Sequence, residues 1–305
     1  MLPGAGGLEL RSAARDLWSG PDGATAVLGA ASAHARLGGG RRLASLETDP
    51  PVAATADLVG RPVATGFRAA VDAALPDERA GRTLLYRLLE ELPVAALISG
   101  YAALYRHQPL TRAGGAGGSA PGLPADVCAG WRADGVMMQA IARDGAIPIP
   151  LGPVAPALDA GDPLAWHAMA PLAPDGMRRR RLLDLAAPDG PEAPLVVTAM
   201  FRDSHVEPGG TETVLHHYDV DVLVDPVGRR VLACRATPRV LPWPECPAAA
   251  ASAGRLVGRR VDEVPALVRT DLRGTSTCTH LNDLLRTLGD VGALADQLLA
   301  RTAAG

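Results

Sequence analysis

Apolar and polar residues alternate with a period of two along three stretches of the C-terminal half, which predicts antiparallel β-strands. The stretches read PLVVTAMFRDSHV, TETVLHHYDVDVLVD and GRRVLACRATPRV. Glycine and proline separate them, in EPGGT at 207–211 and DPVGR at 225–229, as hairpin turns require. Apolar positions then take helical spacing in AAAASAGRLVG, VDEVPALVRTDL and THLNDLLRTL. A strand meander followed by helices on one face is an α+β arrangement.

The two halves of the chain share similarities that occur in the same order, which predicts an internal duplication. RRLASLETDP at 41–50 aligns with RRVLACRATP at 229–238, and LVGRPVATGF from Leu58 aligns with LVGRRVDEVP from Leu256. We therefore expect two pseudo-repeated units, each an antiparallel meander followed by helices. The expected divisions are a degenerate N-terminal copy at 1–110, a linker and irregular connection at 111–175, and a C-terminal copy at 176–305 that carries the site.

The character of the connection between the two copies is predicted from its composition. TRAGGAGGSAPGLP at 111–124 is rich in glycine, proline and serine, which is typical of a flexible linker or surface loop. Residues 128–174 show no clear period and are expected to be irregular.

Composition narrows the function classes. A chain of 305 residues exceeds what one hydrophobic core usually serves, and 48% hydrophobic residues provide ample material for two. The formal net charge of -3 supplies no basic field, so we expect no nucleic-acid partner. All 30 basic residues are arginine, which excludes a Schiff-base lysine, a lysine general base and a P-loop lysine.

No targeting signal is expected. The start, MLPGAGGLELRSAARDLWSG, lacks a charged region followed by a long apolar one, and the longest apolar stretch, 93–105, is shorter than the roughly 20 residues of a bilayer span. These features predict a cytoplasmic chain with no membrane partner. In a reducing compartment four cysteines are expected as free thiols, metal ligands or reactive thiols rather than disulfides.

Two cysteines are predicted at helix N-termini. Pro247 suits a first helical turn and places Cys246 at or next to the N-cap, while Thr277 can cap the next helix and leave Cys278 in its first turn. The helix dipole and the free N–H groups there stabilise a thiolate, which suits a nucleophile or a metal ligand. His280 could act as proton carrier or third ligand.

The alternative for both thiols is core packing, because cysteine is often buried as a small hydrophobe. Cys234, in a strand, and Cys128, in the irregular segment, are interpreted as packing residues. The first half lacks both the WPEC segment and the Cys-Thr-His sequence, so the site is expected in the second half.

The strands contribute a second set of polar candidates. Arg202 is expected either to pair with Asp203 or to hold a substrate carboxylate, and a purely structural pair is the alternative. Alternation predicts His216 and Tyr218 on one face and His217 on the other. The run MRRRRLLDL is expected as a charged, solvated edge strand, with binding of an acyl-CoA phosphate as a minor alternative. The expected substrate-binding residues are His216, Tyr218, Glu212 and Trp243.

The stretch from MFRDS through HHYDVDVLVDPVGRRVLACRATPRVLPWPECPAAAASAGRLVG to RGTSTCTHLNDLL resembles the bacterial family catalogued as domain of unknown function 2889, in its longer actinobacterial type. That resemblance implies an accessory role in aromatic-acid or hydroxycinnamate catabolism. A remoter likeness is to NifU-type iron-sulfur scaffold proteins, where Cys246 and Cys278 match two of three ligand cysteines. The third, expected near Gly209 and Gly210, is missing.

These observations leave three functions open. The leading hypothesis is an enzyme of small-molecule catabolism that acts on an aromatic acyl or acyl-CoA substrate of hydroxycinnamate type. Cys246 and Cys278 would serve as nucleophile or ligands and His280 as base or ligand, with Arg202 and Asp203 completing the catalytic set. The second is a non-catalytic, scaffold-like module in which the same Cys, Cys and His hold zinc or iron, with a carboxylate or His216 as fourth ligand. The third is a structural partner protein, and a homo-oligomer fits all three.

Overall fold

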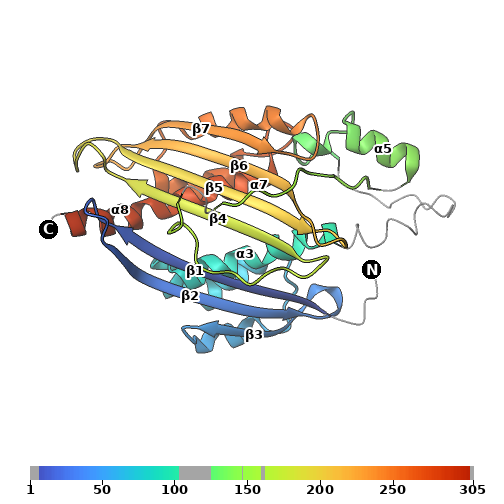
Figure 1. The fold of residues 1–305 in the computed structure, drawn as a ribbon, viewed down its shortest axis with the longest axis horizontal. Helices are drawn as coiled ribbons and strands as arrows, with labels where there is room; N and C mark the ends of the chain where they lie inside the picture. The colour runs from blue at the N-terminus through green and yellow to red at the C-terminus, as the bar shows by residue number, and fades with distance from the viewer. Residues whose placement is uncertain (1–6, 103–124, 146, 159–161, 303–305) are drawn as a thin grey trace. The chain divides into compact units, whose positions relative to one another are not determined.

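The computed structural model describes residues 7–102, 125–145, 147–158 and 162–302. It divides into two compact units, residues 1–100 and 101–305 (Figure 1). The linker expected at 111–124 lies outside the described residues.

The first unit is a three-stranded antiparallel sheet followed by helices. Its strands pair in the order β1 (Leu8–Ser19), β2 (Thr25–Leu37), β3 (Leu43–Asp49). Its other elements include the 3-10 segments η1 (Gly39–Arg41) and η2 (Ala53–Leu58) and the helices α1 (Phe67–Ala74), α2 (Pro76–Ala80) and α3 (Leu84–Ile98). Alternate residues of β2 and one face of α1 and α3 form its core, as period-two and helical patterns require.

The second unit repeats this plan with a four-stranded antiparallel sheet. The strand order is β4 (Met177–Ala186), β5 (Leu195–Val206), β6 (Glu212–Val224), β7 (Val231–Val240). The helices α7 (Thr279–Leu285) and α8 (Val291–Thr302) lie on one face of this sheet (Figure 1). This confirms the α+β class and the meander-then-helices order. The other elements of its described residues are η3 (Ala129–Trp131), α5 (Val136–Asp144), η4 (Cys246–Leu256), η5 (Val261–Glu263), α6 (Val264–Asp271) and η6 (Arg286–Asp290).

Two local expectations differ from the structure. The predicted helix AAAASAGRLVG is instead a run of 3-10 turns, η4. Its small residues Ala249 and Ala253 are fully buried in the hydrophobic core between the sheet and the helices. The stretch expected to be irregular contains η3 and α5. Helix α5 buries Met137 and Ala140, which lie three residues apart on one helical face. Two buried positions make too short a periodic pattern to be recognised among the surrounding glycines and prolines.

The two units match in detail along their strands. In the β1–β2 pair a register shift follows the Asp16–Gly29 partners, and in the β5–β6 pair the same shift follows the Asp203–His216 partners. Register shifts of this kind mark β-bulges, which re-aim side chains. The shared bulge makes Asp16 the counterpart of Asp203 and Gly29 the counterpart of His216.

The turn that precedes the helices is also repeated. Gly60 N–H donates to Leu43 O at 2.7 Å, and Gly258 N–H donates to Val231 O at 2.8 Å. Both glycines have φ of +83° and both belong to the repeated LVGR sequence. The pseudo-repeat expected from the sequence is therefore present in the backbone hydrogen bonds.

The left-handed backbone at Gly258 yields a stability prediction. Replacing Gly258 with alanine should lower the free energy of unfolding by about 1–2 kcal/mol, because a Cβ is strained at positive φ even though no atom lies within 4 Å of its position. Gly254→Ala is the matched control, since its Cβ also meets nothing and its φ is not in the positive range. Urea unfolding of both variants measures the difference, and equal stabilities would contradict the strain argument.

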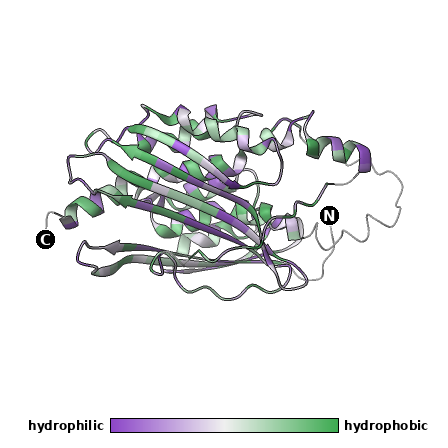
Figure 2. Ribbon diagram, turned by 45° about the horizontal axis from the view of Figure 1, so that its top comes forward, coloured by the Kyte–Doolittle hydropathy of each residue, from purple (hydrophilic) through white to green (hydrophobic). Residues whose placement is uncertain are grey.

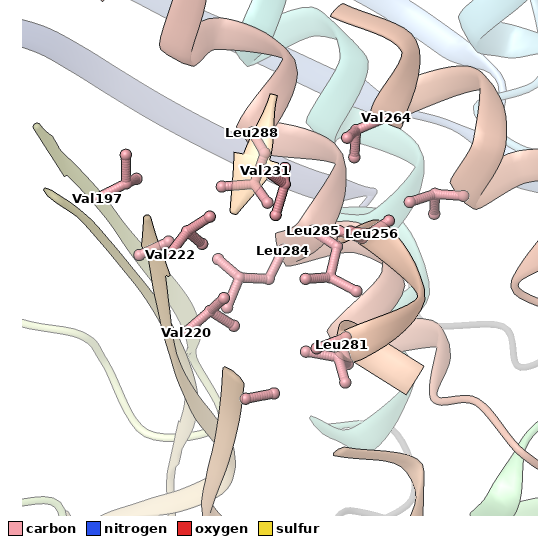
Figure 3. Close-up of a cluster of buried hydrophobic side chains, with 14 of the residues drawn as sticks. Val197, Val220, Val222, Val231, Leu256, Val264, Leu281, Leu284, Leu285 and Leu288 are labelled. Atoms are coloured by element: carbon pink, nitrogen blue, oxygen red, sulfur yellow. The ribbon is translucent and has the colours of Figure 1, made fainter. Parts of the chain in front are cut away.

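The core of the second unit occupies one half of the sheet. Figure 3 shows Val197, Val220 and Val222 of the strands facing Leu281, Leu284 and other helix residues. In Figure 2 the strands are hydrophobic along one half of their length and hydrophilic along the other. The polar half contains the candidate site residues of the strands, among them Arg202, Asp203 and His216.

Among the described residues, none of the helices has the length and apolar character needed to cross a bilayer.

Candidate functional site

Three of the four free cysteines lie where helical segments begin. Cys128 is the N-cap of η3, Cys246 is the first residue of η4, and Cys278 is the N-cap of α7. Cys278 was expected inside the first turn behind a Thr277 cap. The structure makes Cys278 itself the cap, with extended φ and ψ of -130° and 128°, and the Thr277 hydroxyl donates backwards to Gly274 O at 2.9 Å.

Backbone contacts bring the three cysteines together. Ala129 N–H donates to Thr277 O at 2.8 Å, which joins the residues next to Cys128 and Cys278. A Cβ at Gly130 would lie 2.7 Å from Cys246 Sγ, so only glycine allows this approach. Cys128, interpreted from sequence as a packing residue, thus lies in the neighbourhood of the two predicted site cysteines.

The electrostatics of the thiols reflect this cluster. Burial raises the pKa of Cys128, Cys246 and Cys278, that of Cys246 to about 12, and the neighbouring thiols raise the pKa values of Cys246 and Cys278 further. Backbone N–H groups of the following helical residues donate to the sulfurs of Cys128 and Cys278 and oppose the rise. The thiols are therefore neutral by themselves, yet surrounded by donors suited to a thiolate once a cation is present.

Tyr218 and His280 complete the surroundings of the thiols. The pKa of Tyr218 is raised by burial and then by Cys278, Cys246 and Cys128, and its hydroxyl donates to Cys246 O at 3.4 Å. Nδ1 of His280 lies 4.0 Å from Cys278 Sγ. Burial and the neighbouring His216 lower the pKa of His280, so its imidazole is neutral and can offer a lone pair to a metal.

His216 holds the His280 ring by stacking. The two ring centroids lie 3.7 Å apart with an interplanar angle of 19°, and Phe201 stacks on His280 at 6.3 Å. Nδ1 of His216 lies 3.6 Å from an oxygen of Asp203. The alternation prediction is confirmed: His216 and Tyr218 are buried on this face, and His217 contacts Asp219 on the other.

Asp203 is bound by an arginine that sequence reasoning missed. Arg179 of β4 donates Nε and Nη2 to the two carboxylate oxygens, each at 2.7 Å, and Nη1 to Asp283 at 2.6 Å. Asp283 also accepts from Arg181 and Arg286. Burial raises the pKa of Asp203, but the charge and hydrogen bonds of Arg179 outweigh it and hold that pKa well below its usual range.

The expected pair of Arg202 with Asp203 is therefore wrong. Successive residues of a strand point to opposite faces, so Asp203 faces the helices while Arg202 faces away from them. The run expected as a solvated edge strand is an edge strand, β4, but Arg179 and Arg181 are largely buried in ion pairs. Glu212 accepts a hydrogen bond from the Ser204 hydroxyl. Trp243, three residues before Cys246, packs beside Gly130.

Asp203, His216 and His280 form a group whose potential ligand atoms all lie within 4.8 Å of one another. Two features oppose a metal ion here. The guanidinium of Arg179 already occupies both oxygens of Asp203 and repels a cation. Imidazole lone pairs lie in the ring plane, and two rings stacked at 19° direct them side by side rather than to one point. This group instead positions His280 next to Cys278.

Comparison with known proteins adds one finding. Residues 177–293 match the family described as a protein of unknown function, DUF2889. The DUF2889 match runs from β4 into α8 and includes the candidate site residues except Cys128. Comparison with curated proteins finds no match, and neither does comparison with solved structures. The NifU likeness and the actinobacterial type stay predictions.

The N-terminal unit shows what the DUF2889 region adds to the shared fold. Asp16, the counterpart of Asp203, lies 3.7 Å from Arg87. The counterpart of His216 is Gly29, and Leu84 lies 3.7 Å from where its Cβ would be. Thr83 caps α3, the helix that follows α1 and α2, whereas Cys278 caps α7 after α6. The N-terminal unit keeps the carboxylate but lacks both the imidazole and the thiol at these positions.

Proposed function

We propose that the C-terminal unit is a metal-binding, scaffold-like module that holds one zinc or iron ion through Cys128, Cys246, Cys278 and His280. The observation that carries the proposal is the convergence of three buried thiols, each at the start of a separate helical segment, beside a neutral imidazole. One buried cysteine is commonly a packing residue. Three together with a histidine match the Cys3His donor set of tetrahedral zinc sites.

The distance between donors supports this ligand set. Metal–sulfur bonds of about 2.3 Å and metal–nitrogen bonds of about 2.0–2.1 Å in a tetrahedron put sulfur and nitrogen about 3.6 Å apart. Cys278 Sγ and His280 Nδ1 are 4.0 Å apart, so a small side-chain rotation suffices for this pair. The other two sulfurs have to move closer, because no three of the four ligand atoms lie within 4.8 Å of one another. His216 stacks on the proposed ligand ring of His280, and Asp203 lies beside Nδ1 of His216, so both help to fix the orientation of His280. Four free thiols also suit a reducing, cytoplasmic location.

The second candidate is the thiol enzyme acting on an aromatic acyl or acyl-CoA substrate. Its support is the same pair, in which a neutral His280 could take the proton of Cys278. A nucleophilic cysteine needs a lowered pKa, however, and burial raises the pKa of Cys278. The geometry therefore favours the metal over the nucleophile.

Elemental analysis and thiol alkylation separate the two functions. Protein purified without chelator under reducing, anaerobic conditions should contain about one zinc or iron per chain, because a site with four protein ligands binds tightly. Cys278 should react with iodoacetamide slowly until a chelator removes the metal. A metal-free protein whose Cys278 is alkylated rapidly at neutral pH would favour the enzyme and contradict the metal site.

A further inference from the structure

The face of the four-stranded sheet opposite the helices contains a buried guanidinium that forms no ion pair with any residue that the structure describes. Arg202 of β5 is 1% exposed, and its Nε and Nη1 have no hydrogen-bond partner within the part of the chain that the structure describes. Arg180 of β4 is its direct cross-strand neighbour, and the buried Nε of Arg180 likewise lacks a partner there. Two like charges side by side on a sheet are destabilising.

The other groups around this pair do not neutralise it. Arg178, two residues before Arg180, adds a third cation and donates to Ala170 O. The charge of the Glu212 carboxylate acts on Arg202, but Glu212 accepts its hydrogen bond from the Ser204 hydroxyl. On the other side of Arg202, His217 contacts Asp219 rather than the guanidinium. Among the described residues, Glu212 is therefore the carboxylate whose charge acts on Arg178 and Arg202, and it forms an ion pair with neither.

Burial gives the same picture of uncompensated charge. Burial and the charge of Arg180 lower the pKa of Arg202, and the pKa of Arg178 is lowered for the same two reasons. Arginine stays protonated in proteins, so the cost remains as unfavourable free energy in the folded chain. An oxyanion between the two guanidinium groups would remove this cost and would satisfy their free N–H donors.

We propose that Arg180 and Arg202 form a binding site for an oxyanion, the carboxylate or phosphate group of a small molecule. Guanidinium groups bind such groups through paired N–H···O hydrogen bonds, and burial strengthens these bonds. The site is separate from the thiols, because Arg202 and Asp203 point to opposite faces of β5. The oxyanion site can therefore be tested independently of the proposed metal site.

Calorimetry and thermal unfolding of the full chain test the site. Inorganic phosphate and benzoate, each compared with chloride at equal ionic strength, are the two probes and distinguish phosphate from carboxylate ligands. The wild-type protein should bind at least one of them and unfold at a higher temperature in its presence. Arg202→Met should lose at least tenfold in affinity for that anion while its unfolding temperature without anion stays equal or rises, because a costly buried charge is removed.

Two further variants keep the test decisive. Arg180→Met should also lower the affinity for the same anion. It serves as the test variant if Arg202→Met does not fold. Arg239→Gln removes an exposed arginine that pairs with Asp219, and it should bind the anion as the wild type does. The proposal is overturned if neither probe binds, if Arg202→Met or Arg180→Met binds as tightly as the wild type, or if Arg239→Gln weakens binding equally.

Discussion

Replacing Cys128 with serine will lower the affinity of the chain for zinc by more than about 100-fold. Structural zinc sites bind with about 10–16 kcal/mol over four ligands, so one ligand contributes roughly 3 kcal/mol on average, and each 1.4 kcal/mol is tenfold in Kd. Cys128 is expected to contribute because it is a buried thiol that caps η3 near Cys246 and Cys278. Competition with a chromogenic chelator measures the affinity.

Cys234→Ser is the matched control for that measurement. Cys234 is a free, partly buried thiol in β7, and its pKa is raised by burial and then by Asp221 rather than by another cysteine. We expect zinc affinity within about twofold of wild type for this variant. Equal losses in both variants would show that Cys128 acts through general stability, and no loss at Cys128 would remove it from the ligand set.

Asp203→Asn will lower the free energy of unfolding by about 3–5 kcal/mol. The substitution removes one partner of a buried ion pair and leaves the charge of Arg179 with Asp283 alone, a carboxylate that Arg181 and Arg286 share. Asp219→Asn breaks a more exposed pair with Arg239 and should cost at most about 1 kcal/mol. Denaturant unfolding of the metal-free proteins gives both values.

A double variant distinguishes the charge argument from simple loss of packing. Arg179→Met combined with Asp203→Leu removes both charges, and Asp283 keeps Arg181 and Arg286 as partners. We expect the double variant to be more stable than Asp203→Asn alone, because apolar replacement of a buried pair is often neutral. A double variant less stable than Asp203→Asn would contradict the account of this pair.

Much of the fold follows from the sequence because its signals are local. Period-two alternation located β5, β6 and β7, and the repeated LVGR identified the same left-handed glycine in both units. The match between Asp203 and Asp16 was hidden because strand lengths and turns shift the alignment. Only the paired bulges in β1–β2 and β5–β6 reveal it.

The site was predicted in part, for the same reason. Cys246, Cys278 and His280 stand beside proline or hydroxyl residues that mark helix starts, so sequence could select them. Cys128 has no such flanking signal, and its role depends on a contact between segments far apart in the chain. Arg179 lay in a run of four arginines, where alternation separates inward from outward residues but does not name the partner of Asp203.

X-ray absorption spectroscopy of the zinc-loaded chain tests the central claim most directly. The Cys128, Cys246, Cys278 and His280 site predicts a first shell of three sulfurs at about 2.3 Å and one nitrogen at about 2.0–2.1 Å. A shell of nitrogen and oxygen alone would place the metal at Asp203, His216 and His280 instead, and would contradict the thiol site.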